Sequence, residues 1–498
     1  MPIKAIIFDL YGTLIDFKQK SFIKELSAYL GVSPKSVAEK LFKNYLHIAF
    51  ENTSLMISTL LKALFNQEPK QEIVSGCISI LEKYLREVKL KHGVLNTLSF
   101  FKAKGYQLGL VSNLASSFKQ PVYQLGLYKF FDAIVFSCDC GLTKPNSEIY
   151  QLICQSLKID AESCLFVGDS FPNDYQAPKN FGMQAFLVGE KASDNVRSIH
   201  SVNDLGWLNF DADFEKLIYL GKKIKFNDKD WHMTGIEALS DDESGRYNMV
   251  ARVMLEENSQ AKCTVYIKRF ATPSSIQVEK LAYEIYGMVG LSTCQTGILE
   301  GKEPLLMTSE VAGEAWDIQY AEKVAYEIGQ YTGMAYMFSN ADFRPRNVLL
   351  KKSALGNKMQ LIDFEHCFFN VALDLTGLND VNNPLTFNAM CTEEISARRR
   401  HTVLSPKHIK RAVISFFGSL PSTEKILSAY KSGCLDTFSK VRAIQENIKD
   451  LFHKQILFDS SPMMIGTHAY RRAMANIDIE EMMVRINQDI SETNLLWE

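Results

Sequence analysis

The chain has no apolar run approaching the ~18 residues that a membrane-spanning helix requires. Met1 to Lys4 leads directly into the first apolar segment, so we expect no signal peptide. The 55 Lys and Arg residues nearly balance the 57 Asp and Glu residues, and a net charge of -2 gives no reason to expect a polyanionic partner. These absences predict a cytoplasmic protein with no membrane partner.

Closely spaced cysteine pairs, linkers and repeats are also scarce. The ten cysteines are scattered, and the close pair Cys138 and Cys140 lacks the second pair that a zinc site needs. We therefore expect reduced, mainly buried thiols. No long Pro/Gly/Ser linker, repeat or low-complexity segment divides the 498 residues. A chain of this length exceeds one hydrophobic core, so two or three domains in contact are expected.

The chain opens with a short apolar segment that ends in an acid. Ile6, Ile7 and Phe8 predict a buried strand, and Gly12 then breaks it into a turn. A carboxylate such as Asp9, at the carboxyl end of a buried parallel strand, lies where open α/β folds place their ligands. A loop cap is the commoner role for an isolated Asp. We favour a site because matching residues recur downstream.

Polar residues follow three further predicted strands, at 107–111, 132–136 and 165–168. These residues are Ser112 and Asn113, then Lys144, then Asp169 and Asp174. Two acids on one loop are costly to hold together unless a cation shares them. Helical spacing over about 21–88 predicts either a cap over the strand ends or a plain helical layer. With a closing strand at 185–188, the alternation of strands and helices predicts a doubly wound parallel sheet.

Four segments in this order resemble the motifs of the haloacid dehalogenase (HAD) superfamily with a helical cap: DLYGTL at 9–14, VSN at 111–113, TKP at 143–145 and GDSFPND at 168–174. The resemblance predicts a HAD-like domain at 1–208, with a cap at about 17–88. It implies that Asp9 is a nucleophile forming an aspartyl-phosphate and that Lys144 is catalytic. It further implies a phosphate site formed by Thr13, Ser112 and Asn113. The implied Mg²⁺ ligands are Asp9, Asp169, Asp174 and the backbone carbonyl of Tyr11.

Tyr11 departs from the pattern of the superfamily's phosphatases. These usually carry a second Asp there, as a general acid/base that typically contributes about 10²–10⁴-fold. Tyrosine at this position is found in the haloacid dehalogenases, which attack carbon and need no metal. Asp169, the acid that serves the metal, is nevertheless present. Three readings stay open: a Mg²⁺-dependent phosphohydrolase, which we favour, a dehalogenase-type hydrolase, and a weakened or binding-only domain.

The pattern changes after a junction at 209–229. We expect the basic run 222–225 to be a solvated connector. A strand, a turn and a second strand follow, then a third strand carrying Lys268, a helix carrying Glu279 and a buried strand at 305–308. Taken individually, Lys268 and Glu279 would be ordinary surface residues.

Three metal-capable residues come next: Asp342 and Asn347, five apart on a loop, and Asp363 after a short strand. With Lys268 and Glu279, they resemble the protein-kinase-like fold over about 230–380. The predicted domain is a two-lobed α+β unit at 230–498, with an N-lobe at about 230–310 and a C-lobe at about 311–498. The resemblance implies that Lys268, oriented by Glu279, holds ATP phosphates and that Asp342 accepts the acceptor's proton. Asn347 and Asp363 would hold Mg²⁺, with adenine near 308–311.

The kinase motifs are incomplete. The glycine-rich loop is missing, Asn340-Ala341 replaces the usual His-Arg, and Glu365 replaces the glycine of D-F-G. The pattern is closer to divergent, aminoglycoside-phosphotransferase-like members that phosphorylate antibiotics, small metabolites, lipids or unusual proteins. A nucleotide-binding pseudokinase is the alternative.

The two resemblances together predict a bifunctional phosphotransfer protein. Its partners would be a small phosphoester, ATP and a hydroxyl-bearing acceptor, for which we favour a metabolite over a protein. A regulatory or binding protein that has lost one or both activities is the competing hypothesis. Action on RNA is a third, suggested only by basic residues between Arg398 and Arg411. We favour a solvated helical face for them, and strongly salt-dependent RNA affinity would argue otherwise.

Overall fold

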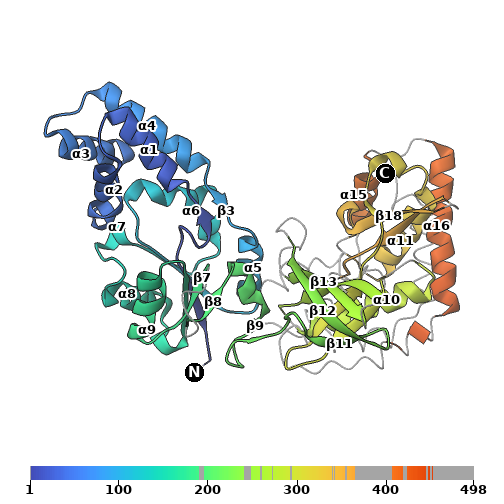
Figure 1. The fold of residues 1–498 in the computed structure, drawn as a ribbon. Coiled ribbons are helices and arrows are strands. Elements are labelled where there is room, and N and C mark those ends of the chain that lie inside the picture. The colour runs from blue at the N-terminus through green and yellow to red at the C-terminus, as the bar shows by residue number, and fades with distance from the viewer. Residues whose placement is uncertain are drawn as a thin grey trace, which may run out of the picture. The chain divides into compact units, whose positions relative to one another are not determined.

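The computed structural model describes residues 2–189, 196–239, 248–257, 261–271, 273–291, 294–338, 340, 343–353, 356–364, 406–418, 423–444, 447–448 and 451. The chain forms two compact units (Figure 1), Met1–Leu220 with Ile236–Arg252, and Gly221–Gly235 with Val253–Glu498. Among the described residues, no helix combines the length and the apolarity that crossing a membrane would take.

A six-stranded parallel sheet organises the first unit, in the order β5-β4-β1-β6-β7-β8. Its strands are β1 (Ala5–Phe8), β4 (Gln107–Ser112), β5 (Ala133–Phe136), β6 (Cys164–Gly168), β7 (Gln184–Val188) and β8 (Ser198–Ile199). Phe8 pairs with Leu110 on one side and with Val167 on the other. The residues after β1, β4 and β6 therefore meet at one edge. The predicted parallel α/β sheet is confirmed, although β8 extends it beyond the strand expected to close it.

Helices between the strands complete this layer: α5 (Val94–Ala103), α6 (Gln120–Gln124), α7 (Ser137–Cys140), α8 (Ser147–Leu157) and α9 (Ala177–Phe181). Helix α8 packs Ile149, Tyr150 and Ile153 against Ile7 and Phe166 of the sheet. A short antiparallel pair, β9 (Leu208–Asn209) and β10 (Glu215–Lys216), follows β8. The core thus fixes the central strands from which the polar residues extend.

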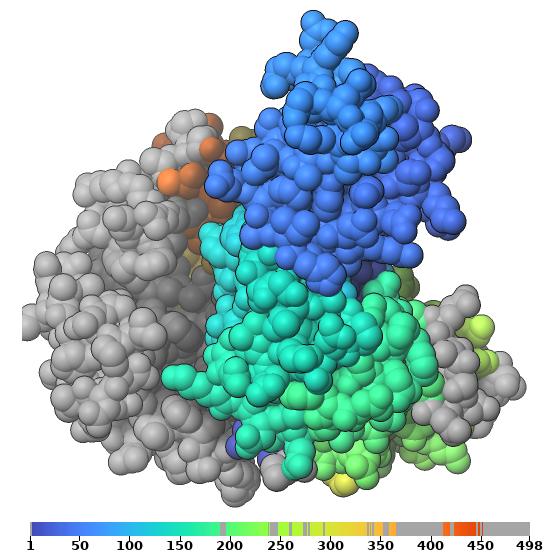
Figure 2. All heavy atoms as spheres, turned by 90° about the vertical axis from the view of Figure 1, so that its left-hand side faces the viewer, coloured from blue at the N-terminus to red at the C-terminus, as the bar shows by residue number. Residues whose placement is uncertain are grey.

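Four helices are inserted between β1 and β4: α1 (Gln19–Leu30), α2 (Pro34–Phe42), α3 (Thr53–Phe65) and α4 (Gln71–Arg86). Ser33 begins α2 by accepting a hydrogen bond from the Ser36 N–H, and Pro34 suits the first turn. The chain enters and leaves the insertion through an antiparallel pair, β2 (Ile15–Asp16) and β3 (Lys89–Leu90). Figure 2 shows the insertion, in blue, above the sheet-bearing part, in cyan and green.

A six-stranded sheet in the order β11-β12-β13-β14-β16-β15 underlies the second unit, although the last residues of β12 and the first of β13 fall within the Ile236–Arg252 segment of the first unit. The pairs β11–β12, β14–β16 and β15–β16 are antiparallel. Its strands are β11 (Lys223–Phe226), β12 (Lys229–Ala238), β13 (Met249–Glu257), β14 (Ala261–Arg269), β15 (Thr296–Leu299) and β16 (Leu305–Ser309). Helix α10 (Pro273–Met288) follows β14. A second antiparallel sheet contains β17 (Glu314–Ala315), β18 (Val348–Ser353) and β19 (Gly356–Leu361).

We expected the basic run at 222–225 to be a connector, but this prediction was wrong. Most of the run lies in the edge strand β11. The segment Lys223–Phe226 alternates exposed lysines with the buried side chains of Ile224 and Phe226. This period of two gives the strand one apolar face, and it pairs with β12. Counting the lysines alone hid the alternation.

Three further helices are described in the second unit: α11 (Ala325–Met337), α15 (Pro406–Phe417) and α16 (Glu424–Ala443). Helices α11 and α16 approach closely because both carry glycine at the crossing. A Cβ on Gly329 would overlap the Tyr430 carbonyl oxygen, and one on Gly433 would overlap that of Tyr326. The two-lobed kinase-like arrangement stays a prediction for this unit.

Candidate active site

Asp9 lies directly after β1, and its backbone N–H donates to the Val167 carbonyl, 2.9 Å away. Lys144 is held over the same strand ends. Its ammonium donates to Asp9 Oδ1 at 2.6 Å, to Asp174 Oδ1 at 2.6 Å and to the Val111 carbonyl at 3.2 Å. All three charged side chains are buried. One buried cation therefore joins two carboxylates that are far apart in the sequence.

The environment of these groups shifts their protonation. Burial raises the pKa of Asp9 to about 7; Lys144 opposes the rise, and Asp174 and Asp169 add to it. Burial alone would lower the pKa of Lys144, but the carboxylates of Asp174 and Asp9 raise it above its usual range. Lys144 thus stays charged, while Asp9 lacks enough positive charge nearby to ionise fully at neutral pH.

Asp169 completes an acidic cluster with Asp9 and Asp174, in which one oxygen of each carboxylate lies within 4.8 Å of the others. Partial desolvation and the neighbouring Asp174 raise the pKa of Asp169. Asp174 is held in place by the Ser170 N–H, which donates to its Oδ2 at 2.9 Å. Three carboxylates sharing one ammonium retain excess negative charge, and hard oxygen ligands of this kind suit Mg²⁺. The residues present fit such an ion.

Gly12 allows Asp169 to approach, a role that the sequence reasoning did not assign to it. Its φ is +81°, which favours glycine, and a Cβ there would overlap the Asp169 carboxylate. Lys91 donates to the Gly12 carbonyl and supports the same turn. The sequence signal for this role was the glycine within DLYGTL, which we interpreted only as the residue that ends the strand.

The residues predicted to bind phosphate lie around Asp9 and Lys144. Thr13 Oγ1 donates to Asp9 Oδ2 at 3.4 Å, and Ser112 is buried at the end of β4. Asn113 uses its amide on the backbone of Lys144, donating to the carbonyl and accepting from the N–H, each at 2.9 Å. Asn113 therefore positions the segment that carries the catalytic lysine candidate.

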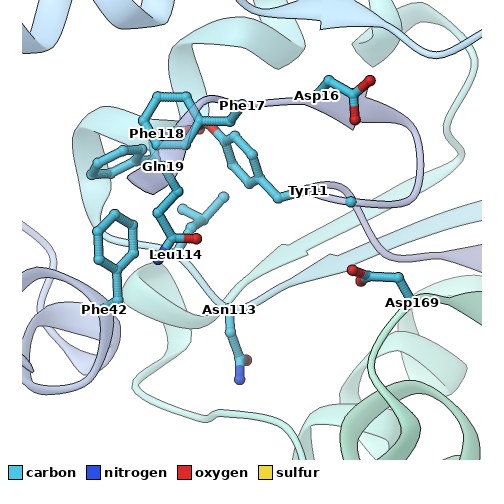
Figure 3. A pocket seen from close by; sticks show the side chains of 10 residues that line it. Tyr11, Asp16, Phe17, Gln19, Phe42, Asn113, Leu114, Phe118 and Asp169 are labelled. Atoms are coloured by element: carbon cyan, nitrogen blue, oxygen red, sulfur yellow. Dashed lines mark hydrogen bonds between the residues drawn. The ribbon is translucent and has the colours of Figure 1, made fainter. Parts of the chain in front are cut away.

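The Tyr11 side chain does not occupy the place of an acid beside Asp9. Its hydroxyl donates to the Phe118 carbonyl at 2.8 Å, and its ring packs edge-on against Phe17 and Phe118. Burial raises the pKa of the Tyr11 hydroxyl. In Figure 3 the ring extends away from Asp169.

A pocket of about 250 Å³ opens beside this cluster. Figure 3 shows aromatic rings on one side and Asn113 and Asp169 on the other. The described residues that line it are Tyr11, Gly12, Asp16, Phe17, Gln19, Phe42, Asn113, Leu114, Phe118 and Asp169. The sequence reasoning missed its aromatic members. They are not sequence neighbours, and only folding brings Phe42 at the end of α2 to Phe118, with ring centroids 5.3 Å apart.

In the second unit, Lys268 on β14 links two of the predicted residues. Its Nζ lies 2.7 Å from Glu279 Oε1 on α10 and 3.3 Å from Asp363 Oδ1. Glu279 is fully buried. Asp363 has a φ of +68°, and its N–H donates to the Tyr283 hydroxyl at 3.2 Å. The structure thus brings together a lysine, its helix glutamate and the acid after β19.

Asn347 is buried at the end of a 3₁₀ turn, Pro345–Asn347, and its carbonyl accepts from the Ile362 N–H at 2.8 Å. That bond ties the asparagine's backbone to the segment next to Asp363. Several predicted features lie outside the described residues: Asp342, Ala341, Glu365, the turn at 244–245 and the arginines at 398–400.

The fold and this site agree with the family comparison. The family of haloacid dehalogenase-like hydrolases matches residues 3–182. A pyrophosphatase PpaX from Bacillus velezensis is 30% identical over 190 residues, covering 36% of this chain and 80% of that protein. The chain therefore belongs to the haloacid dehalogenase-like hydrolases through its first unit.

Particular relatives are similar over the same part of the chain. A glyceraldehyde 3-phosphate phosphatase from Methanothermobacter thermautotrophicus is 28% identical over 210 residues, which cover 41% of this chain and 93% of that protein. The crystal structure of a HAD phosphatase from Thermococcus onnurineus covers 41% of this chain and 96% of its own, with 22% identity and a TM-score of 0.32.

Proposed function

We propose that the first unit is a Mg²⁺-dependent phosphohydrolase that acts through an aspartyl-phosphate on Asp9. The observation that carries the proposal is the buried Lys144 ammonium, 2.6 Å from both Asp9 and Asp174, beside a third carboxylate. The names of the similar relatives, a glyceraldehyde 3-phosphate phosphatase and a pyrophosphatase, favour phosphorus over carbon as the atom that Asp9 attacks.

The roles follow from position and charge. Asp9 attacks the phosphorus with a carboxylate oxygen, and Lys144 neutralises charge on the phosphoryl oxygens. Thr13 and Ser112 offer hydroxyls to those oxygens, and Asn113 positions Lys144 through the backbone. This arrangement fixes the catalytic groups before the substrate arrives, and such orientation lowers the entropic cost of reaching the transition state.

Asp9, Asp169, Asp174 and the Tyr11 carbonyl are the candidate ligands for Mg²⁺. The ion, when bound, would supply positive charge that favours the ionised form of Asp9 and offsets the charge of the phosphoryl group. The raised pKa of Asp9 without the ion supports this assignment, because burial and the two nearby carboxylates together disfavour the ionised form more than Lys144 favours it.

Dehalogenase-type hydrolysis is the second candidate for this unit, favoured by Tyr11. The tyrosine hydroxyl is engaged by Phe118 and offers no proton to a leaving oxygen. Halide needs no such proton. The substrate panel should therefore include a short 2-haloacid as an alternative substrate to the phosphoesters.

For the second unit, we infer a divergent ATP-dependent phosphotransferase that acts on a hydroxyl-bearing small molecule. The ion pairs of Lys268 with Glu279 at 2.7 Å and with Asp363 at 3.3 Å support this inference. Lys268 would hold ATP phosphates, and Asn347 with Asp363 would hold Mg²⁺. Asp342 would accept the acceptor's proton. A pseudokinase that binds nucleotide without transfer is the alternative.

The test uses the full chain. Phosphate release with and without Mg²⁺ is measured over a phosphoester panel for wild type, Asp9→Asn and Asp160→Asn, an exposed carboxylate before a 3₁₀ turn. We expect Asp9→Asn to lose at least 10³-fold and Asp160→Asn to match wild type. Release of halide but not phosphate would replace the phosphatase proposal with the dehalogenase.

ATP turnover by the second unit needs a background without the first site. We therefore compare Asp9→Asn with the double variant Asp9→Asn/Asp363→Ala over a panel of hydroxyl-bearing metabolites. Acceptor-dependent turnover that requires Asp363 supports transfer. Nucleotide binding with no turnover on any acceptor would favour the pseudokinase.

A further inference from the structure

One wall of the pocket beside Asp169 is aromatic. Tyr11, Phe17 and Phe42 are each half-buried, while Phe118 is fully buried between them. Their ring centroids lie 5.3 to 5.7 Å apart for the pairs Phe42–Phe118, Phe17–Phe118 and Tyr11–Phe17. Half-buried rings around a cavity offer edges and faces to a further ring, at a spacing that aromatic pairs prefer.

The other lining residues disfavour an anionic leaving group. None of the described lining residues is a lysine, arginine or histidine, whereas Asp16 and Asp169 are carboxylates. A second phosphate or a carboxylate on the substrate would meet negative charge without a cation in the pocket. The leaving group that fits therefore carries no negative charge.

Among the described lining residues, no side chain is left to act as a general acid for the leaving oxygen. The Tyr11 hydroxyl donates its hydrogen to the Phe118 carbonyl at 2.8 Å. Asp16 is exposed, and its carboxylate already pairs with the Lys91 ammonium at 3.8 Å. Without a general acid, the leaving group must depart as an anion. A phenol, with a pKa of about 10, does so far more readily than an aliphatic alcohol.

The size of the pocket limits the leaving group further. Its volume of about 250 Å³ lies below the roughly 300–1,000 Å³ typical of sites for drug-sized ligands. A single ring suits this space.

We propose that the first unit hydrolyses aryl phosphate monoesters whose leaving group is one aromatic ring without a negatively charged substituent. The inference rests on the proposed phosphohydrolase function and specifies its substrate class. Three independent observations carry it: the aromatic wall, the absence of positive charge among the described lining residues, and the engagement of the Tyr11 hydroxyl by Phe118.

The reaction balances with water as the only co-reactant. An Asp9 oxygen forms a bond to phosphorus, the phosphorus–oxygen bond to the ring breaks, and the phenolate leaves with the electron pair and takes a proton from solvent. Water then attacks the aspartyl-phosphate, restores the Asp9 carboxylate and releases inorganic phosphate and one proton. The proton taken up in the first step is returned in the second.

Hydrolysis of four substrates by the full chain with Mg²⁺ separates the effect of an aromatic ring in the leaving group from the effect of the leaving group's acidity. Phenyl phosphate has both, and hexafluoroisopropyl phosphate has an alcohol of similar acidity without a ring. Propyl phosphate has neither, and acetyl phosphate serves as an activated reference. We expect kcat/KM for phenyl phosphate to exceed that for hexafluoroisopropyl phosphate at least tenfold, and the latter to exceed propyl phosphate at least tenfold.

The outcomes distinguish this inference from the function on which it rests. If no substrate, acetyl phosphate included, releases phosphate in an Asp9-dependent manner, the phosphohydrolase itself is refuted. If acetyl phosphate is hydrolysed and propyl phosphate reacts as fast as phenyl phosphate, only the aryl specificity is refuted.

Two variants test the cause. Tyr11→Asp places a candidate acid at the pocket, and we expect kcat/KM for propyl phosphate to rise at least tenfold relative to phenyl phosphate. Phe42→Leu should raise KM for phenyl phosphate at least fivefold, whereas Phe65→Leu, at an exposed position on α3, should not. An unchanged substrate ratio in a Tyr11→Asp variant that still hydrolyses acetyl phosphate, or equal KM values for the two leucine variants, would overturn the assignment.

Discussion

Lys144 and Asp9 form a buried ion pair of 2.6 Å, with only 3% and 9% of their side chains exposed. The same ammonium lies 2.6 Å from Asp174, so neither carboxylate has the lysine to itself. Breaking a buried pair leaves an uncompensated charge, which costs more than the pair contributes. Substitutions at this candidate active site should therefore also destabilise the fold.

Replacing Lys144 with methionine should destabilise the first unit by about 3–5 kcal/mol, because Asp174 and Asp9 would lose their shared cation. Urea unfolding at pH 8 measures the change. Lys18→Met is the matched control, since Lys18 pairs with Glu87 at 2.9 Å but with 69% and 43% of the side chains exposed. It should cost less than about 1 kcal/mol. Equal losses would contradict the buried network.

Gly12→Ala should impair the site more than the fold. The new methyl group would displace Asp169, so we expect at least a tenfold weaker apparent Mg²⁺ affinity in phosphate-release assays. Gly31→Ala controls for backbone strain alone, because Gly31 has a φ of +67° and no atom within 4 Å of an added Cβ. Gly31→Ala should cost about 1 kcal/mol of stability and leave Mg²⁺ dependence as in wild type. A Gly12→Ala variant with wild-type Mg²⁺ affinity would argue against the placement of Asp169.

The stability of the cation-free protein should depend on Asp9 in a defined pH window. The folded-state pKa of about 7 exceeds the unfolded value of about 3.9, so the folded state binds more protons between these values. The contribution of Asp9 is therefore favourable at low pH and is lost as pH rises from about 4 to about 7. The difference in unfolding free energy between wild type and Asp9→Asn should fall by on the order of 2–4 kcal/mol across this window.

Denaturant unfolding at several pH values, with EDTA, measures this difference. Saturating Mg²⁺ should reduce the fall, because a nearby cation favours the ionised carboxylate. Parallel curves for wild type and Asp9→Asn would mean that Asp9 titrates normally.

Lys268→Met should destabilise the second unit by about 3 kcal/mol, because fully buried Glu279 would lose its cation. It should also abolish the shift in melting temperature produced by Mg²⁺-ATP. Lys280→Met is the control on α10, the helix that carries Glu279, because Lys280 pairs there with Glu284 at partly exposed positions. The control should cost less than about 1 kcal/mol and keep the nucleotide shift. Loss of the shift in both variants would point to general damage to α10.

The sequence allowed the sheet and its polar edge to be predicted for a physical reason. Short apolar strands with helices between them admit few topologies, and parallel strand ends meet at one edge. Asp9, Lys144, Asp169 and Asp174 could be grouped on that basis before any coordinates.

Other parts of the site depend on contacts that no local pattern encodes. The double pairing of Lys144 and the engagement of Tyr11 by Phe118 require atomic distances. The aromatic wall requires packing of the insertion against the segment after β4. In the second unit, Lys268 and Glu279 are individually ordinary in sequence, and only the structure shows their burial and their 2.7 Å contact.

The pairing of β2 with β3 means that the helical insertion could be lost or exchanged in evolution without the rest of the unit. Asp16 pairs with Lys89, so the chain departs and returns at adjacent points, and a tight hairpin could replace everything between them. Excision would leave the neighbours of β1 in the parallel sheet untouched while removing Phe17 and Phe42 from the pocket. Such a miniature enzyme would retain its reacting groups and lose its selectivity, so exchange of this one segment between homologues is a direct route to new substrates.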